Sequence, residues 1–377
     1  MAPSLPLKLL SNAVVGPYPL SHRVVHAPMT RLRADRDDSP SQMMQRYYEQ
    51  RASRGGLLIV ESTHPSLESR GYLGAPGIYT DAHRDAWKPI VEAVHAKGGV
   101  IFLQLGHDGR QSHSDLSNGK PPIAPSVVPF ETNAFTQDGW VPASPHRAVD
   151  KDELPALVES YRQSAQRALD AGFDGVELHN ANGYLLDTFL QDGTNKRTDE
   201  YGGPIENRVR FPLQVLDALV SVWGADRVGV RVSPSGQWGS ISDSDPQATF
   251  EYFARRLNEY GLAYLHVIEP RIKGTDEIEP DRPPVAAAFL RPFFDGPIIA
   301  AGGFDRGGAE AIVQSGAADL VAFGRHFSAN PDLPERLRHD WPLTPYVRDA
   351  FWGGTAQDYN DFPEYSAEAE ALSDLVN

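Results

Sequence analysis

Residues 174–184, DGVELHNANGY, join a short apolar run to a group of polar side chains. The run ends at His179, Asn182 follows three residues later, and Tyr184 follows two residues after that. Two neutral hydrogen-bonding side chains that leave a strand end together can bind a polar oxygen and stabilise negative charge that develops on it. Tyr184 adds a phenol that can donate a proton. The alternative is a strand-end histidine capped by a loop asparagine, without a catalytic role.

Seven similar runs, short and rich in β-branched or apolar residues, lie on either side of this one. They are RVVHAP (23–28), LLIVES (57–62), GVIFLQL (99–105), RVGVRV (227–232), YLHVIEP (264–270), PIIAAGG (297–303) and DLVAFG (319–324). The clearest of the amphipathic stretches between them keeps one apolar face from Leu154 to Leu169 and ends at Gly172. Strand–helix alternation implies parallel pairing, so we predict an α/β fold, a (β/α)8 TIM barrel formed as a single domain by residues 1–377. A doubly wound open sheet is the alternative.

Two segments do not fit the barrel repeat. Residues 121–145 contain six prolines and form a long excursion after the third predicted strand, which we expect to act as a lid or cap. A solvated surface loop is the alternative. The tail, residues 341–377, is too rich in aromatic residues for a free terminus, and we expect it to pack on the barrel.

Composition excludes several classes of function. The net charge of −15 argues against nucleic acid and against an anionic membrane surface, because both require a surplus of Lys and Arg. No apolar stretch is long enough for a transmembrane helix and the first residues lack a signal core, so we expect a cytoplasmic protein. The absence of cysteine excludes disulfides and iron–sulfur clusters, so redox chemistry would need a bound cofactor.

Polar residues at the strand ends favour a mononucleotide cofactor. Gly302 and Gly303 follow the seventh predicted strand, and Gly324 and Arg325 follow the eighth, where barrels of this type often bind phosphate. Tight turns are the alternative explanation for the glycines. Gln104 and Arg231 interrupt apolar strands, as expected if they meet a polar ring, although Arg231 could also belong to a structural ion pair. FMN fits this combination.

Dedicated motifs for other ligands are missing. No GxGxxG follows a predicted strand and no GxxxxGK[ST] occurs, so a nicotinamide would be a visiting substrate. There is no HExxH, and the spacing of His107 and His113 matches no recognised metal site, so we expect no metal.

With these residues in place, the chain resembles the Old Yellow Enzyme family of FMN-dependent ene-reductases over nearly its whole length. The segments that carry the resemblance are HAPMTRLRA (26–34), RGYLGAPGIY (70–79), FLQL (102–105) and, most specifically, ELHNANGYLLDTFLQDGTNKRTDEYGGPIENR (177–208), followed by GVRVSP, HVIEPR, AGGF and FGRHFSANPDL. The resemblance implies reduction of the C=C bond of enones, enals, maleimides or nitroalkenes, driven by NADPH or NADH, in a monomer or homodimer.

The resemblance also implies a role for individual residues. His179 and Asn182 would bind the activating group of the alkene, and Tyr184 would deliver a proton. Tyr359, in the tail, would line the substrate mouth. The residues expected to hold FMN are Pro28, Met29, Thr30, Ser62, Gln104, Arg231, Gly302, Gly303, Gly324 and Arg325.

One position departs from the family pattern. Many relatives carry tryptophan two residues after the position of Gln104, whereas this chain has Gly106, so we expect Gly106 to enlarge one wall of the substrate pocket. Two alternatives to an ene-reductase stay open: the same flavin barrel acting as an isomerase or dehydrogenase, and a metal-dependent barrel hydrolase or lyase using His179 and His107.

Overall fold

The computed structural model describes residues 7–273, 276–277 and 284–367. Eight parallel strands form a closed barrel in the order β10-β11-β12-β15-β16-β3-β4-β5. Their bounds are β3 (Val24–His26), β4 (Leu57–Thr63), β5 (Val100–Leu105), β10 (Gly175–Asn180), β11 (Val228–Val232), β12 (Tyr264–Ile268), β15 (Ile298–Ala301) and β16 (Leu320–Phe323). All eight predicted strands are present, and the predicted (β/α)8 barrel is confirmed. Pairing of β16 with β3 closes the sheet and rules out the open alternative.

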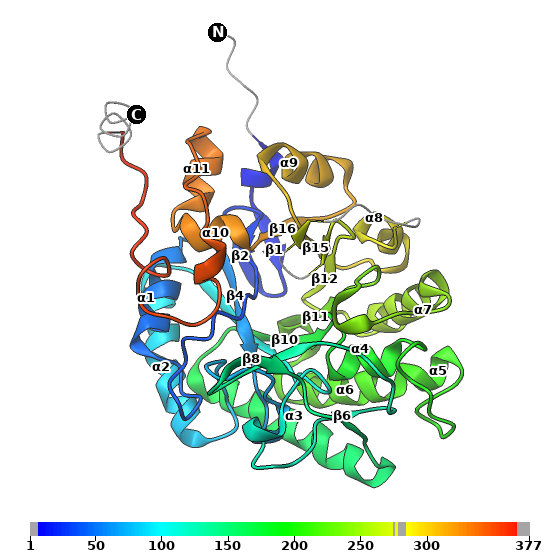
Figure 1. Ribbon diagram of the computed structural model, residues 1–377. Coiled ribbons are helices and arrows are strands. Elements are labelled where there is room, and N and C mark those ends of the chain that lie inside the picture. Colours follow the sequence, from blue (N-terminus) through cyan, green and yellow to red (C-terminus); the bar gives the residue numbers. More distant parts are fainter. Residues whose placement is uncertain (1–6, 274–275, 278–283, 368–377) are drawn as a thin grey trace.

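Helices surround the strands on the outside of the barrel (Figure 1). The α-helices are α1 (Gln42–Arg51), α2 (Asp81–Ala96), α3 (Leu154–Ala171), α4 (Leu185–Leu190), α5 (Ile205–Arg208), α6 (Arg210–Trp223), α7 (Pro246–Asn258), α8 (Ala287–Leu290), α9 (Arg306–Ser315), α10 (Arg325–Ala329) and α11 (Leu333–His339). The predicted helix is α3, which ends at Gly172 because that residue adopts a left-handed conformation (φ 94°) favourable to glycine.

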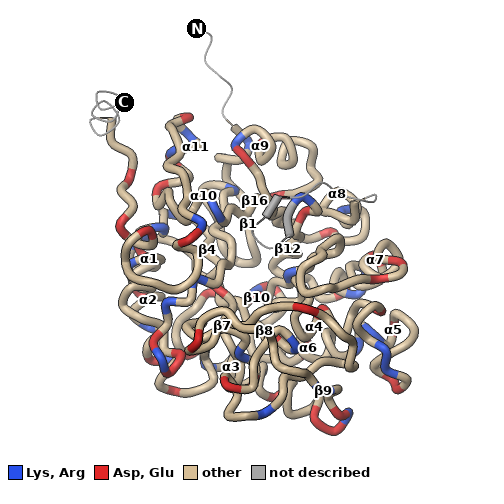
Figure 2. The backbone as a smooth tube through the Cα atoms, viewed as in Figure 1, with Lys and Arg blue, Asp and Glu red and all other residues tan. Residues whose placement is uncertain are grey.

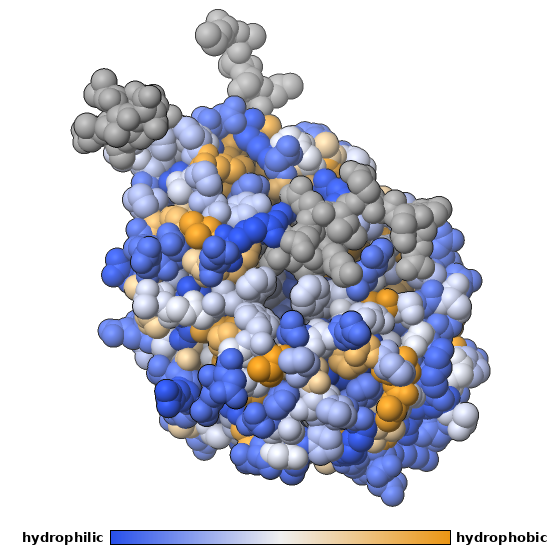
Figure 3. Space-filling model, in the orientation of Figure 1, coloured by the Kyte–Doolittle hydropathy of each residue, from blue (hydrophilic) through white to orange (hydrophobic). Residues whose placement is uncertain are grey.

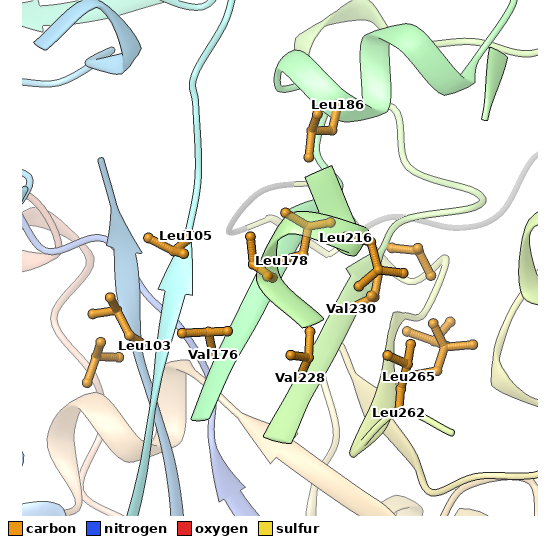
Figure 4. Close-up of a cluster of buried hydrophobic side chains, with 14 of the residues drawn as sticks. Leu103, Leu105, Val176, Leu178, Leu186, Leu216, Val228, Val230, Leu262 and Leu265 are labelled. Atoms are coloured by element: carbon orange, nitrogen blue, oxygen red, sulfur yellow. The ribbon is translucent and has the colours of Figure 1, made fainter. Parts of the chain in front are cut away.

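The strand sequences divide their side chains between two environments. Val176 and Leu178 of β10 point outward and pack with side chains of neighbouring strands and helices, including Leu216 of α6 (Figure 4). The alternate residues Glu177 and His179 are buried on the other face, as the period of two requires. Glu177 and His179 therefore lie inside the barrel.

The barrel interior is apolar at the amino-terminal ends of the strands. Phe102, Tyr264 and Ile299 form a buried cluster there with Val15 and Leu20 of an N-terminal hairpin made of β1 (Ala13–Val15) and β2 (Tyr18–Leu20). The hairpin closes the amino-terminal end of the barrel, which leaves the carboxyl ends of the strands as the open end.

The excursion after β5 covers part of that open end. It contains the hairpin β7 (Asn133–Thr136) and β8 (Gly139–Pro142), together with β6 (Ile123–Ala124), which pairs with β9 (Arg147–Ala148). Buried Arg110 holds the excursion in place: its guanidinium lies 4.1 Å from the Phe130 ring and donates hydrogen bonds to the carbonyl oxygens of Val128 and Gly239. We call residues 121–145 the cap.

The aromatic tail returns to the barrel, as Figure 1 shows for the segment after α11. Arg31 and Arg33 both donate hydrogen bonds to the carbonyl oxygens of Ala350 and Phe351. The amide of Gly353 donates to the carbonyl oxygen of Arg31 at 2.9 Å. The tail is thus bound to the loop that follows β3.

Charged residues lie mostly on the outer helices and loops. Lys and Arg are interspersed with Asp and Glu over the elements drawn in Figure 2. Within the described residues, no helix combines the length and the apolar character needed to cross a membrane. A remaining small hairpin pairs β13 (Ile272–Lys273) with β14 (Asp276–Glu277).

Candidate active site

A cavity of about 830 Å³ opens at the carboxyl ends of the barrel strands. Figure 3 shows a hollow near the centre of this face. Twelve of the fifteen predicted site residues line the cavity: Pro28, Met29, Thr30, Gln104, His179, Asn182, Tyr184, Arg231, Gly302, Gly303, Gly324 and Arg325. Ser62, Gly106 and Tyr359 do not. A pocket of this size, lined by apolar surface and a few polar groups, is suited to a small ligand.

A buried carboxylate organises the floor of the cavity. Glu177 accepts a hydrogen bond from Gln104 Nε2 at 2.6 Å and contacts His266 Nδ1 at 2.8 Å. Burial alone would raise the pKa of Glu177, but His266 and Arg231 hold it below its ordinary value. The amide of Gln104 is therefore fixed in one orientation by an ionised neighbour.

His179 and Arg231 are neighbours across the β10–β11 pairing. Both are buried, and in the described part of the molecule neither His179 Nδ1 nor Arg231 Nε has a hydrogen-bond partner. Burial, with the positive charge of Arg231 next, lowers the pKa of His179 well below its ordinary value, so the imidazole is neutral at physiological pH. Unpaired buried polar atoms are costly and rare, and these two belong to side chains that line the cavity, which is typical of a ligand-binding site.

The loop after β10 presents Asn182 in an unusual backbone conformation. Its φ of 59° lies in the left-handed region, which asparagine tolerates better than most residues. Its amide N–H donates to Ser233 Oγ at 2.7 Å, and its carbonyl oxygen accepts from Gln111 Nε2 at 2.8 Å. Because both backbone groups are bonded and no described residue pairs with the side chain, the Asn182 amide is free to bind a ligand.

Tyr184 lies beside His179, with ring centroids 5.1 Å apart. Burial raises the pKa of Tyr184 well above its ordinary value, so its phenol carries a proton at neutral pH. Just before it, the amide of Gly183 donates to the buried carboxyl of Asp187 at 2.8 Å, which anchors this turn to α4. His179, Asn182 and Tyr184 therefore all border the same cavity.

The glycines predicted to meet a phosphate border the other end of the cavity. Gly302 and Gly303, after β15, have positive φ values of 122° and 63°, which a side chain would strain. A Cβ atom at Gly324, after β16, would lie only 3.0 Å from Met29 Sδ. Arg325 Nη1 contacts Tyr346 Oη at 3.4 Å beside these glycines. Exposed backbone next to an arginine is a suitable environment for a phosphate.

The prediction for Tyr359 needs correction. Its side chain is fully buried and stacks on Tyr47 with ring centroids 4.4 Å apart, away from the cavity. The tail residues that line the cavity are instead Tyr346, Phe351 and Trp352. Composition indicated an aromatic tail, but contacts with distant residues, such as the hydrogen bond from Arg51 to the Tyr359 carbonyl oxygen, place the Tyr359 ring away from the cavity.

The prediction that Gly106 enlarges one wall of the substrate pocket also needs correction, because Gly106 does not line the cavity and a neighbouring side chain occupies the space beside it. A Cβ atom there would collide with Ser62 Oγ and lie 3.4 Å from His179 Cδ2. The Ser62 hydroxyl fills the space that the missing side chain would leave. Ser62 and Gly106 thus lie behind the cavity wall and support His179.

Several lining residues were not predicted individually. Tyr72 follows β4 and contacts Tyr184, and Trp140 of the cap contacts Trp352 with ring centroids 5.7 Å apart. The segment 237–240 and the cap residues 131–133 also line the cavity. All of these lie outside the barrel strands, in connecting segments whose short hairpin strands and turns carry no barrel periodicity to indicate which side chain points inward.

Metal-binding geometry is absent from the part of the chain that the structure describes. No group of three or more His, Cys, Asp or Glu side chains there could hold a metal ion. His107 is one of the two histidines that the metal-dependent alternative would use. Its Nδ1 accepts a hydrogen bond from the amide of Gly109 at 3.0 Å.

Comparisons with known proteins identify relatives of the whole chain. A model of the NADH:flavin oxidoreductase / NADH oxidase family matches residues 9–344. The chain is 44% identical over 375 residues to 12-oxophytodienoate reductase 1 of Oryza sativa subsp. japonica, covering 96% of this chain and 94% of that protein. A structure of morphinone reductase in complex with tetrahydroNAD is similar with a TM-score of 0.89 at 45% identity, covering 96% of this chain and 98% of that one. The Old Yellow Enzyme homologue from Zymomonas mobilis has a TM-score of 0.91 at 41% identity, with coverages of 95% and 99%.

Proposed function

Because the chain belongs to the NADH:flavin oxidoreductase / NADH oxidase family, we propose a role for each polar residue of its cavity in alkene reduction. The predicted resemblance to Old Yellow Enzyme is confirmed, as are FMN as the cofactor and a nicotinamide as the reductant. When bound, FMN supplies the hydride-transfer chemistry that protein side chains lack.

The cavity residues fit FMN. Arg231, with an unpaired Nε, and Gln104, with an amide fixed by Glu177, suit the polar edge of the ring system. Pro28, Met29 and Thr30 line the cavity beside them. The phosphate would lie against the remaining predicted cofactor residues, Gly302, Gly303, Gly324 and Arg325. The cation at Arg231 would stabilise negative charge on the ring.

His179 and Asn182 bind the carbonyl or nitro oxygen of the substrate. Their side chains lack partners in the described protein, and they are held in place by burial and by the Ser233 and Gln111 bonds to Asn182. Donors fixed in advance stabilise the charge that develops on the oxygen during reaction more than they stabilise the ground state. This pair of side chains, which no described residue engages in a hydrogen bond, is the observation that carries the proposal.

Tyr184 gives its proton to the carbon next to the activating group. Its phenol lines the same cavity as His179, and burial keeps it protonated. General acid catalysis of this kind contributes about 10²- to 10⁴-fold in rate. Enones, enals, maleimides and nitroalkenes share the required oxygen and C=C bond, and we propose these as the substrate class.

NADH is the proposed reductant over NADPH. One similar structure is a complex with tetrahydroNAD, and among the described residues the cap contributes Glu131 but no cation to the cavity lining. A carboxylate at the mouth disfavours the extra phosphate of NADPH. Glu131→Gln should narrow the ratio of kcat/KM for NADH to that for NADPH, whereas an unchanged ratio would assign the preference elsewhere.

The whole proposal is tested by separating its two half-reactions. Anaerobic mixing of the flavin-loaded protein with NADH or NADPH should bleach the flavin absorbance, and addition of an enone or nitroalkene should restore it. Protein that purifies without flavin, or reduced flavin that none of these alkenes re-oxidises, contradicts it. Monomer or homodimer as the assembly and the cytoplasm as the location are further proposals, tested by light scattering and by cell fractionation.

A further inference from the structure

A second phenol, Tyr72, lies against Tyr184 inside the cavity. The two hydroxyl oxygens are 3.3 Å apart, and both side chains line the cavity. In the described part of the molecule the Tyr72 hydroxyl has no other hydrogen-bond partner. A pair of hydroxyls carries two protons but uses only one of them in the bond between them, so the second proton is available for transfer.

The Tyr72 loop is held firmly from one side by a buried dyad. The amide of Gly71 donates to Asp108 Oδ2 at 2.7 Å, and the same oxygen contacts His64 Nε2 at 3.0 Å. His64 and Asp108 are both almost completely buried. This fixes the backbone next to Tyr72.

The cap holds the loop from the other side. The amide of Leu73 donates to the carbonyl oxygen of Phe135 at 2.7 Å. The Tyr72 ring packs edge-on against Trp140, with centroids 5.9 Å apart. The Tyr72 hydroxyl is therefore placed by the surrounding structure and does not depend on Tyr184 for its position.

Resting on the proposed role of Tyr184, we propose that Tyr72 and Tyr184 form a two-proton relay, in which Tyr72 replaces the proton that Tyr184 gives to the substrate. The Tyr184 O–H bond breaks as the new C–H bond forms, and the Tyr72 proton moves to the Tyr184 oxygen. The negative charge comes to rest on the Tyr72 oxygen, where Tyr184 now donates a hydrogen bond to it. Water entering the cavity after product release returns the proton to Tyr72.

The environments of the two phenols favour this direction. Burial raises the pKa of both phenols, and Asp108 raises both further. The hydrogen bond from Tyr184 lowers the pKa of Tyr72, whereas Tyr72 raises that of Tyr184, which only the smaller effect of Arg231 lowers. A tyrosinate is thus less unfavourable at Tyr72. A relay avoids leaving the charge at Tyr184.

The first test compares two variants with the wild type in the two half-reactions. Tyr72→Phe keeps the ring but removes the hydroxyl, and it should slow re-oxidation by 2-cyclohexenone about 10- to 100-fold, the effect of one hydrogen bond to a charged group. Flavin reduction by NADH should be unchanged. Tyr18→Phe is the matched control, because the Tyr18 hydroxyl donates to the carbonyl oxygen of Asp174 at the closed end of the barrel, and it should match the wild type.

Mixtures of H₂O and D₂O count the protons that move. For the wild type, the rate of flavin re-oxidation should vary non-linearly with the deuterium fraction, because two protons move. For Tyr72→Phe, the rate should vary linearly with it. A linear wild type, or equal curvature in both proteins, would overturn the relay. If flavin re-oxidation is slow in Tyr184→Phe but as fast in Tyr72→Phe as in the wild type, the relay is contradicted and the proposed role of Tyr184 as proton donor stands. A fully active Tyr184→Phe contradicts the proposed proton donor itself.

A readout without catalysis uses 3,5-difluorotyrosine at position 72 in the flavin-free protein, because this phenol ionises at lower pH than tyrosine. Its absorbance should show ionisation at higher pH when Tyr184 is replaced by Phe, since the donor to its phenolate is lost. An unchanged titration would show that the two hydroxyls are not coupled.

Discussion

Gln104 Nε2 donates a 2.6 Å hydrogen bond to Glu177 Oε1, and both side chains are buried at the floor of the cavity. The same carboxylate balances the positive charge of Arg231, whose hydrogen bond among the described residues is a long one, 3.5 Å, to the carbonyl oxygen of Pro28. Glu177 therefore supports both residues proposed to meet the flavin ring edge, although it does not line the cavity itself.

Glu177→Gln should lower the free energy of unfolding of the flavin-free protein by about 3–5 kcal/mol, because it leaves Arg231 as an uncompensated buried charge. It should also weaken FMN binding. Urea unfolding and titration of FMN fluorescence measure the two effects. Glu68→Gln is the control, because Glu68 forms a surface ion pair with Lys120 whose loss should cost at most about 1 kcal/mol. Equal effects of the two changes would contradict the role of Glu177.

His179→Ala and Asn182→Ala should each slow alkene reduction by about 10²- to 10³-fold, the usual cost of losing one donor to a developing oxyanion. Both should weaken the binding of phenols, which place an oxygen at the same donors. FMN should stay bound, so the absorbance spectrum of the purified variants is the control. Loss of FMN from either variant would indicate that the residue supports the fold of the cavity instead.

The raised pKa of Asp187 should make the free energy of unfolding depend on pH. Burial raises the pKa of this carboxyl to about 7, so folding keeps it protonated at pH values where the unfolded chain has released the proton. Its contribution to stability is full below its ordinary pKa and is lost as the pH rises through about 7. The free energy of unfolding of the wild type should therefore fall relative to that of Asp187→Asn, by at most about 4 kcal/mol. Urea unfolding of both proteins at pH 5 and pH 8 measures this, and parallel pH profiles would refute it.

Position 106 offers a test of the packing behind His179. Gly106→Ala should displace the Ser62 hydroxyl and press on the imidazole, and so should slow alkene reduction while FMN remains bound. The double variant Ser62→Gly/Gly106→Ala should recover most of the rate, because the clashing oxygen is gone. Ser62→Gly alone is the control. A slow double variant would contradict this explanation.

The barrel was predictable because each strand carries its own signal. RVGVRV and LLIVES are short β-branched runs of the kind that parallel sheets bury, and they became β11 and β4. Strand ends converge on one face of a barrel, so Gln104, His179 and Arg231 could be placed together before the structure was known. The outward-facing Val176 and Leu178 follow from the same alternation.

Loop residues were beyond this kind of reasoning. Tyr72 reaches Tyr184 only because Asp108 and the cap fix its loop, and these contacts join residues far apart in the sequence. Tyr359 and Trp352 are equally aromatic, and their placement involves hydrogen bonds to the tail backbone from Arg31 and Arg33 near Trp352 and from Arg51 at Tyr359. Such bonds to main-chain carbonyl groups leave no pattern in the sequence.

The pairing of β16 with β3 also sets an order of events during synthesis. The first barrel strand, β3, can pair with the last, β16, only after β16 has been made, and until then the free edge of each strand lacks backbone hydrogen bonds. The residues that line the cavity extend from Ala27 to Trp352. Contacts between such distant residues form late in folding. Because a ribosome that has made most of this chain has not yet made the last strand, we expect FMN to bind the finished polypeptide and not the growing one.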